Sequence, residues 1–314
     1  MNTRKSLALA TLSMLFASGT VWSSCYAPPT PPYIHVATWA VDRIGGEGLQ
    51  YLEDFAQDTA GNILVTDALD ACVYVFNPNG DLLSRFGSKG HHPGALEKPE
   101  GIAIDLHGNI FVGDYISGHV QKFAPDYSHV LTFADFGAAP GQTSEAEFMC
   151  IAPNGLIYLA DAGNDRIDVF NLDGEFQFMF GEPGSGPGQL NRPEAAKADR
   201  QGNIFVTDLG NNRIQVFTSE GVCVRSWGRE GNAPGQFRKP CGLAIDHNDH
   251  VYVTEVGNAR VQKFDLEGNF LCLWGQPGVR PGEFDNPHGI LVDAAGRVYV
   301  ADTGNHRIQV FQPH

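Results

Sequence analysis

The sequence is poor in basic residues. Lys and Arg number 21 among its 314 residues, against 36 Asp and Glu, so the formal net charge is −15 at pH 7. Proteins bind nucleic acids largely by setting Lys and Arg side chains against phosphates. The acidic balance therefore removes nucleic acid from the partners that we expect.

The apolar run near the start of the sequence, Leu7 to Ala17, is too short for a stable membrane span, which needs about 20 residues. It follows Arg4 and Lys5 and precedes small residues, an order typical of a secretory signal. We therefore expect an exported protein, periplasmic or extracellular. Its predicted parts are a signal peptide (residues 1–24), a Pro-rich leader (25–32) and one folded domain (33–314).

Two processing routes remain open for this leader. Cleavage could follow Gly19, a small residue as the signal requires. Alternatively Cys25 is the lipidated first residue of a lipoprotein, although Trp22 stands where such a signal has an aliphatic residue. Only lipidation would place the protein at a membrane.

The sequence also lacks a repeated disulfide framework. Its six cysteines share no common position in the repeat described below, and connectivity cannot be assigned from sequence. Cys150, Cys223 and Cys272 lie within strand patterns, where we interpret them as small buried apolar residues.

Helical periodicity is absent after the leader, and a repeat takes its place. The stretch DTGNHRIQVF, which begins at Asp302, recurs in related form at intervals of 47 residues, starting at Glu255, Asp208, Asp161, Asp114 and Asp67. Self-similarity at a fixed period of this length indicates a repeat architecture.

Each repeat unit contains four short strand patterns separated by turn residues. In the second unit they are GIAID from Gly101, IFVGD from Ile110, HVQKF from His119 and a last strand ending at Gly137. Val, Ile and Phe fill the strands, while Gly, Asn and Asp fill the joins. Such units, repeated six times, predict an all-β fold, a six-bladed β-propeller.

The two ends of the chain predict how the ring closes. The sixth unit stops at His314, after its third strand. The segment from His35 to Val41 precedes the first unit, and its Trp39 aligns with the outer-strand aromatic Phe86. We therefore expect the N-terminal strand to complete the last blade, which leaves no open sheet edge between the ends.

The unit Pro-x-Gly-Ile-Ala-x-Asp, Gly-Asn-x-x-Val-x-Asp, Gly-Asn-x-Arg-Ile-Gln-Val-Phe resembles the NHL repeat, over roughly residues 33 to 314. The resemblance implies the propeller fold. It does not choose a function, because NHL-like propellers include RNA-binding modules, protein-binding scaffolds, extracellular sensors and the metal-dependent peptidyl-hydroxyglycine amidating lyase.

One column of the repeat, at the start of the first strand of each unit, is rich in carboxylates. Equivalent residues of a propeller form a ring, so this column predicts a ring at one opening of the channel: Glu53, Glu100, Glu147, Glu194, Cys241 and His288. Carboxylates suit Ca²⁺, whereas a Cys and a His favour zinc. All six residues are therefore candidate ligands of a divalent cation, calcium or zinc.

The resemblance to the amidating lyase bears on this ring. That enzyme places zinc-binding histidines in Pro-His-x stretches at this position of separate blades, and here only Pro287-His288-Gly289 matches. The alternative interpretation is that each glutamate of the ring pairs with a nearby arginine.

A second column suggests which glutamates have such partners. It holds Arg166, Arg213, Arg260 and Arg307 in units three to six, but Cys72 and His119 in the first two. If these arginines balance the ring, Glu53 and Glu100 have no counter-charge. With the neighbouring loop residues they make up our candidate binding set, which is Glu53, Glu100, His91, His92, Tyr115, His119 and Arg307.

Two further ionisable residues, Asp54 and Lys197, occupy positions of the inner strands that are otherwise small or apolar. We expect each to face channel water; a water-bridged contact between them across the ring is the alternative.

These patterns favour a monomeric binding module that presents its channel mouth to a protein, peptide, glycan or other small-molecule ligand. The sequence carries no recognisable Ser-His-Asp signature. The alternative is a metal-dependent lyase or hydrolase whose ion at the mouth acts as Lewis acid or water activator. His119 or Tyr115 would then be the catalytic candidates that move a proton.

Overall fold

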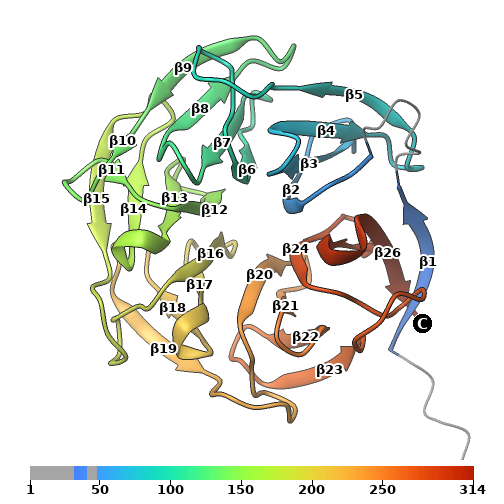
Figure 1. Cartoon of the computed structure of the whole chain (residues 1–314). Helices are drawn as coiled ribbons and strands as arrows, with labels where there is room; N and C mark the ends of the chain where they lie inside the picture. Colours follow the sequence, from blue (N-terminus) through green and yellow to red (C-terminus); the bar gives the residue numbers. More distant parts are fainter. Residues whose placement is uncertain (1–31, 41–47) are drawn as a thin grey trace, which may run out of the picture. The chain divides into compact units, whose positions relative to one another are not determined.

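The computed structural model describes residues 32–40 and 48–314, which form six four-stranded sheets arranged in a ring (Figure 1). The predicted signal peptide, the possible lipidation site Cys25 and Val41 lie outside these residues. The prediction of an all-β, six-bladed propeller is confirmed. None of the described residues belongs to a helix that is long and apolar enough to cross a membrane.

The first three blades follow one another along the chain. Blade 1 consists of β2 (Leu52–Gln57), β3 (Ile63–Asp67), β4 (Cys72–Phe76) and β5 (Leu82–Phe86). Blade 2 consists of β6 (Pro99–Ile104), β7 (Ile110–Asp114), β8 (Val120–Phe123) and β9 (His129–Phe133). Blade 3 consists of β12 (Ala146–Ile151), β13 (Ile157–Asp161), β14 (Arg166–Phe170) and β15 (Phe176–Phe180).

The last three blades repeat this order, except that the outer strand of blade 6 is the first strand of the chain. Blade 4 consists of β16 (Pro193–Ala198), β17 (Ile204–Asp208), β18 (Arg213–Phe217) and β19 (Cys223–Trp227). Blade 5 consists of β20 (Pro240–Ile245), β21 (His250–Glu255), β22 (Arg260–Asp265) and β23 (Phe270–Trp274). Blade 6 consists of β24 (Pro287–Val292), β25 (Val298–Asp302), β26 (Arg307–Pro313) and, as its outer strand, β1 (Tyr33–Trp39).

Short elements lie in the loops. The 3₁₀ turns η1 (Ala162–Asn164), η2 (Leu209–Asn211) and η3 (Thr303–Asn305) follow the second strands of blades 3, 4 and 6. The parallel pair β10 (Asp135–Phe136) and β11 (Gln142–Thr143) joins blade 2 to blade 3. The outer strand of blade 2 therefore does not run to Gly137 as expected. It ends at Phe133 because Ala134 takes a left-handed conformation, with φ 57°.

The closure predicted from the chain ends is confirmed. Strand β1 pairs antiparallel with β26, from Tyr33 opposite Pro313 to Trp39 opposite Ile308 (Figure 1). The buried indole of Trp39 packs 5.2 Å from the ring of Tyr299 in blade 6 and 5.7 Å from that of Phe76 in blade 1. The N-terminal strand thus holds the first and last blades together.

The core lies between neighbouring blades. All five residues of β3 are buried, on both faces of the sheet. Leu64 and Val73 of blade 1 pack in one cluster with Ile102 and Val112 of blade 2. Because each sheet is apolar on two faces, it needs a neighbour on each side, and the ring supplies both.

The aspartates at the end of the inner strands are turn residues, as expected for Asx-type turns. Asp199 Oδ1 accepts a hydrogen bond from the Asn203 backbone N–H at 2.8 Å, and Asp58, Asp105, Asp246 and Asp293 make the equivalent bond.

Candidate functional site: the channel mouth

The six residues of the predicted ring occupy the second position of the six inner strands, β2, β6, β12, β16, β20 and β24. Five of them line one cavity of about 300 Å³, which we call the channel mouth: Glu53, Glu100, Glu147, Glu194 and His288. The sixth, Cys241, contacts the ring through its Sγ, 3.5 Å from Glu194 Oε1. The column of the repeat thus comes together as expected.

Glu53, Glu100, Glu147 and Cys241 of the ring are almost fully buried, Glu194 and His288 are partly buried, and most of the six have one polar partner. His288 Nδ1 lies 2.5 Å from Glu53 Oε2, and Lys98 Nζ lies 2.5 Å from Glu100 Oε1. Glu147 differs, because its Oε2 is buried and has no hydrogen-bond partner. Its side chain faces the cavity with only 2% of its surface exposed.

Burial and crowding of like charges make the ring hold protons. Loss of hydration on burial raises the pKa of Glu53 to about 8, and the neighbouring Glu100 adds to the rise. Burial, Glu194 and Glu100 raise the pKa of Glu147 well above its ordinary value. Burial alone would lower the pKa of His288, but the Glu53 carboxylate more than offsets this and raises it to about 9. The same surroundings raise the pKa of Cys241, which favours its thiol form.

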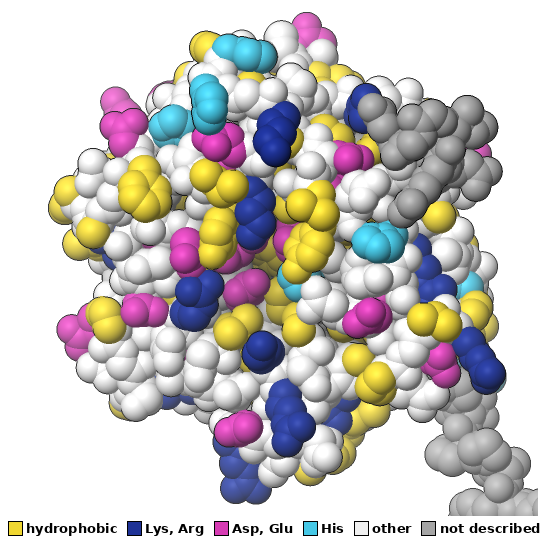
Figure 2. All heavy atoms as spheres, in the orientation of Figure 1, with side chains coloured by type: hydrophobic (Ala, Val, Ile, Leu, Met, Phe, Trp, Pro, Cys, Tyr) yellow, Lys and Arg dark blue, Asp and Glu magenta, His cyan; other side chains and the backbone are white. Residues whose placement is uncertain are grey.

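A second tier of residues lies two positions before the ring in each unit. It consists of Tyr51, Lys98, Glu145, Arg192, Lys239 and Asn286, and all but Glu145 line the mouth. Figure 2 shows acidic and basic side chains together around the centre of this face. We did not predict this tier from the sequence, although it follows the same 47-residue spacing as the ring.

The backbone of the second tier is strained in four units. Glu145, Arg192, Lys239 and Asn286 have φ values of 58°, 50°, 50° and 51°. Residues other than glycine rarely adopt this left-handed region, and such strain gathers at functional sites. Arg192 Nη1 pairs with Glu145 Oε2 at 2.9 Å, whereas Lys239 makes no ion pair among the described residues.

Below the ring, Lys197 and Asp54 meet directly across the channel. Lys197 Nζ lies 2.9 Å from Asp54 Oδ2 and donates to the Met149 carbonyl oxygen at 3.1 Å. The expectation that each side chain faces water is therefore wrong, because the long Lys197 side chain reaches from blade 4 to blade 1. Lys197 also lines a separate cavity of about 170 Å³, and neither residue of the pair lines the channel mouth.

Comparison with known families agrees with this geometry. A model of the NHL repeat matches residues 284–311, and a model described as a 6-bladed beta-propeller matches residues 197–273. The chain is a six-bladed β-propeller with an NHL repeat in its last blade. A search of curated proteins by sequence found no match to it.

Solved structures share the fold of this NHL-repeat propeller at low identity. One is a protein of unknown function from Bacteroides thetaiotaomicron, with a TM-score of 0.67 and 14% identity over 89% of this chain and 73% of that one. Another is a catalytically inactive virginiamycin B lyase from Staphylococcus aureus with quinupristin, with a TM-score of 0.63 and 15% identity over 88% of this chain and 87% of that one. A streptogramin B lyase gives a TM-score of 0.61 and 15% identity over 84% and 79%.

The arginine column of the NHL-repeat propeller does not neutralise the ring. Arg213 Nε lies 2.7 Å from Asp208 Oδ2, the residue opposite it on the neighbouring strand. The other three pair in the same way with acids at the end of the second strand: Arg166 with Asp161, Arg260 with Glu255 and Arg307 with Asp302. The interpretation that these arginines balance the glutamates is therefore wrong. Lys98 and His288 supply the ring's cations.

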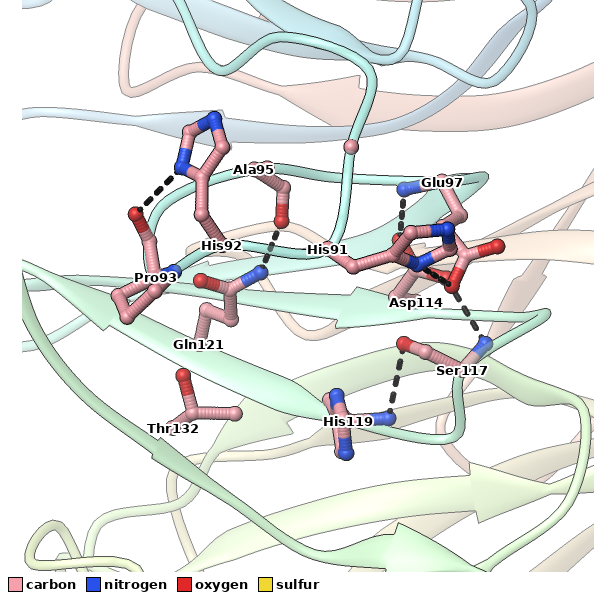
Figure 3. Close-up of a pocket in the computed structure, with 11 residues that line it drawn as sticks. His91, His92, Pro93, Ala95, Glu97, Asp114, Ser117, His119, Gln121 and Thr132 are labelled. Atoms are coloured by element: carbon pink, nitrogen blue, oxygen red, sulfur yellow. Dashed lines mark hydrogen bonds and ion pairs between the residues drawn. The ribbon is translucent and has the colours of Figure 1, made fainter.

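The remaining candidate residues divide between two cavities of the NHL-repeat propeller. Tyr115 lines the channel mouth, where Lys98 Nζ lies 3.6 Å from the centre of its ring. His91, His92 and His119 line a different cavity of about 140 Å³ over blade 2 (Figure 3). The sector predicted as one site thus contains two.

From the sequence we expected the ring residues to be ligands of a divalent cation. Within residues 32–40 and 48–314, no three or more His, Cys, Asp or Glu side chains are grouped as metal ligands. His288 Nδ1 faces Glu53, and Glu100 pairs with Lys98.

Proposed function

We propose that this chain is an exported binding module that takes a small molecule or peptide through an ammonium group at the channel mouth. Glu147 carries the proposal: its Oε2 is buried, faces the cavity and has no hydrogen-bond partner. A buried carboxylate with one unpaired oxygen is costly unless it gains a proton or a cation. A ligand ammonium group would supply both charge and hydrogen bonds.

The second tier supports a ligand that also has an anionic end. Lys239 lines the entrance of the mouth without an ion-pair partner among the described residues. The carboxylates of the ring and the Lys239 ammonium group at the entrance complement a zwitterion that enters the mouth with its ammonium group first. Tyr51 and Tyr115 line the same cavity and offer apolar surface to the part between.

Calorimetric titration with 4-aminobutyrate and its N-acetyl derivative at pH 7 tests the proposal. We expect the amine to bind and the neutral amide not to bind. Glu147→Gln should weaken binding by about tenfold or more, because it removes one charge-assisted hydrogen bond. The control Glu175→Gln changes an exposed glutamate of blade 3 and should leave the affinity unchanged. Equal binding of the amine and the amide would refute the ammonium site.

A metal-dependent lyase or hydrolase is the second candidate, because lyases share this fold and His288 places an acid–base group beside Glu53. Of the two residues expected to move a proton, His119 lines another cavity and Tyr115 lines the mouth. Elemental analysis after dialysis against limiting zinc or calcium decides between the candidates. Equal, negligible metal in the native protein and in a Glu53→Ala, His288→Ala double variant would end the metal hypothesis.

A further inference from the structure

The cavity over blade 2 corresponds to a position that an arginine fills in four other blades. In blade 4 the Arg213 guanidinium donates through Nη1 to the Ser185 carbonyl oxygen at 2.7 Å, and through Nη2 to those of Gly186 and Gln189, both at 2.8 Å. Its Nε donates to Asp208 Oδ2 at 2.7 Å. Three carbonyl oxygens and one carboxylate therefore surround the planar group.

The same cradle recurs around the ring. Arg166 donates to the carbonyl oxygens of Ala138, Ala139 and Gln142, and Arg260 to those of Asn232, Ala233 and Gln236. Arg307 donates to those of Arg280 and Glu283. The loop before each of these blades is thus a receptor for a guanidinium group.

In blade 2 the loop keeps this conformation but the arginine is missing. Gly90 has φ 159°, close to the 152° of Gly184. Leu96 N–H donates to the Ser88 carbonyl oxygen at 2.9 Å, as Leu190 N–H does to that of Glu182. By this correspondence, the carbonyl oxygens of His91, His92 and Ala95 hold the places of those in blade 4.

His119 stands where blades 3 to 6 have arginine, and it does not fill the cradle. Its Nε2 lies 3.7 Å from Asp135 Oδ1, beyond the loop, and its side chain is 39% exposed. A cavity of about 140 Å³ remains, with the buried carboxylate of Asp114 and the Glu97 side chain in its wall (Figure 3). Among the described residues, no other donor takes the guanidinium's place at the His91 carbonyl oxygen.

We propose that this cavity binds the guanidinium group of a ligand, either of a free arginine-like molecule or of an arginine side chain in a peptide. The chain's own arginines show which group such a cradle accepts. A guanidinium has five donors in a rigid plane and can reach three carbonyl oxygens and a carboxylate together, which an ammonium group cannot. The described residues also form no metal-ligand group here.

The proposal is independent of the channel mouth, because none of its cradle residues lines that cavity. Access comes from solvent, since the His91 side chain is 82% exposed. Blade 1, which has Cys72 in this column, offers no comparison because residues 41–47 of its loop lie outside the described part of the chain.

Titration of the full chain with N-ethylguanidinium, followed by NMR, tests the cavity. We expect N-ethylguanidinium to shift the amide resonances of the loop from Ser88 to Leu96, and ethylammonium to bind at this loop about tenfold more weakly. The variant His119→Arg places the chain's own guanidinium in the cradle and should abolish binding. Failure of the native chain to bind, or equal binding by His119→Arg, would overturn the proposal.

Arg213→His provides the matched control, since it empties the equivalent cradle of blade 4. We expect this variant to bind two equivalents of N-ethylguanidinium and to regain stability when the cation is added. A folded variant that binds only one equivalent contradicts the proposal. If Arg213→His does not fold, the comparison of the native chain with His119→Arg is the test of the proposal.

Two further titrations distinguish a free small molecule from a peptide as the source of the guanidinium group. Free arginine and N-acetyl-arginine-methylamide are titrated against the native chain. Tighter binding of free arginine assigns a small-molecule ligand, and equal or tighter binding of the blocked residue assigns a peptide side chain. Failure of both to bind would overturn the proposal, even if N-ethylguanidinium binds.

Discussion

Glu147 is the side chain on which the account of the mouth depends. A carboxylate that is 2% exposed and accepts no hydrogen bond through one oxygen is rare in a native protein, where buried polar groups are generally satisfied. Its neighbours Glu100 and Glu194 carry the same charge and make ionisation harder. The folded protein therefore retains protons at the mouth that the unfolded chain would release.

This retention predicts how stability depends on pH. The folded-state pKa of Glu53 is about 8, against an ordinary value of 4.5, so its contribution is complete below pH 4.5 and lost as the pH rises through 8. Glu147 contributes with the same sign. We expect the free energy of unfolding, measured with urea, to fall between pH 5 and pH 8.

Two variants test the origin of this slope. Glu147→Gln cannot titrate and should reduce the loss of stability between pH 5 and pH 8. Glu175→Gln, on the surface of blade 3, should keep it. An unchanged slope in Glu147→Gln would show that the mouth is not its source.

The closing strand β1 is the element that holds the ring shut. Trp39 carries much of this contact, because it is buried against Phe76 and Tyr299 of two different blades. Gly80, at φ 94°, approaches the indole so closely that a Cβ there would overlap it. The indole and the turn of blade 1 therefore fit each other closely.

Trp39→Ala should lower the free energy of unfolding by about 3–5 kcal/mol, as large-to-small changes in packed cores do. Val36→Ala, on the exposed face of the same strand, should change it by less than about 0.5 kcal/mol. Urea unfolding monitored by circular dichroism measures both. A loss below about 1 kcal/mol for Trp39→Ala would mean that β1 is not a closing strand in solution.

The strands themselves could be predicted from the repeat, because its period places the same residues in each blade. The end of the outer strand of blade 2 could not be predicted from the repeat. In blades 1, 3, 4 and 5 a glycine such as Gly87 follows the outer strand. Ala134 takes the same left-handed conformation, which costs a residue with a Cβ more free energy than it costs glycine. The pair β10 and β11 is the extended form of a parallel bridge that recurs in the other loops, for example between Lys89 and Leu96.

The ring at the channel mouth could likewise be predicted from one column, since equivalent residues of a closed ring must meet around its axis. The counter-charges of the ring could not be predicted from this column. The register between β17 and β18 sets Arg213 opposite Asp208, whereas Lys98 pairs with Glu100, two residues further along the same segment. The repeat column itself marks neither pairing. The pair of Asp54 and Lys197 depends on the diameter of the whole ring, which no local pattern contains.

The proposed mouth joins these features in one function. Buried glutamates hold protons, Lys98 and His288 neutralise only part of the charge, and Lys239 offers a cation at the entrance. An incoming ammonium group should therefore compete with protons for the ring. Binding and proton release are then linked.

Calorimetric titration with butylammonium at pH 7, repeated in buffers of different ionisation enthalpy, measures this linkage directly. The amine keeps its proton at pH 7, as a lysine side chain does, so any proton released must come from the protein. We expect the native chain to release protons on binding and Glu147→Gln to release fewer. Binding with no proton release, or the same release from Glu147→Gln, would contradict the proposal that the buried glutamates of the channel mouth form the ligand site.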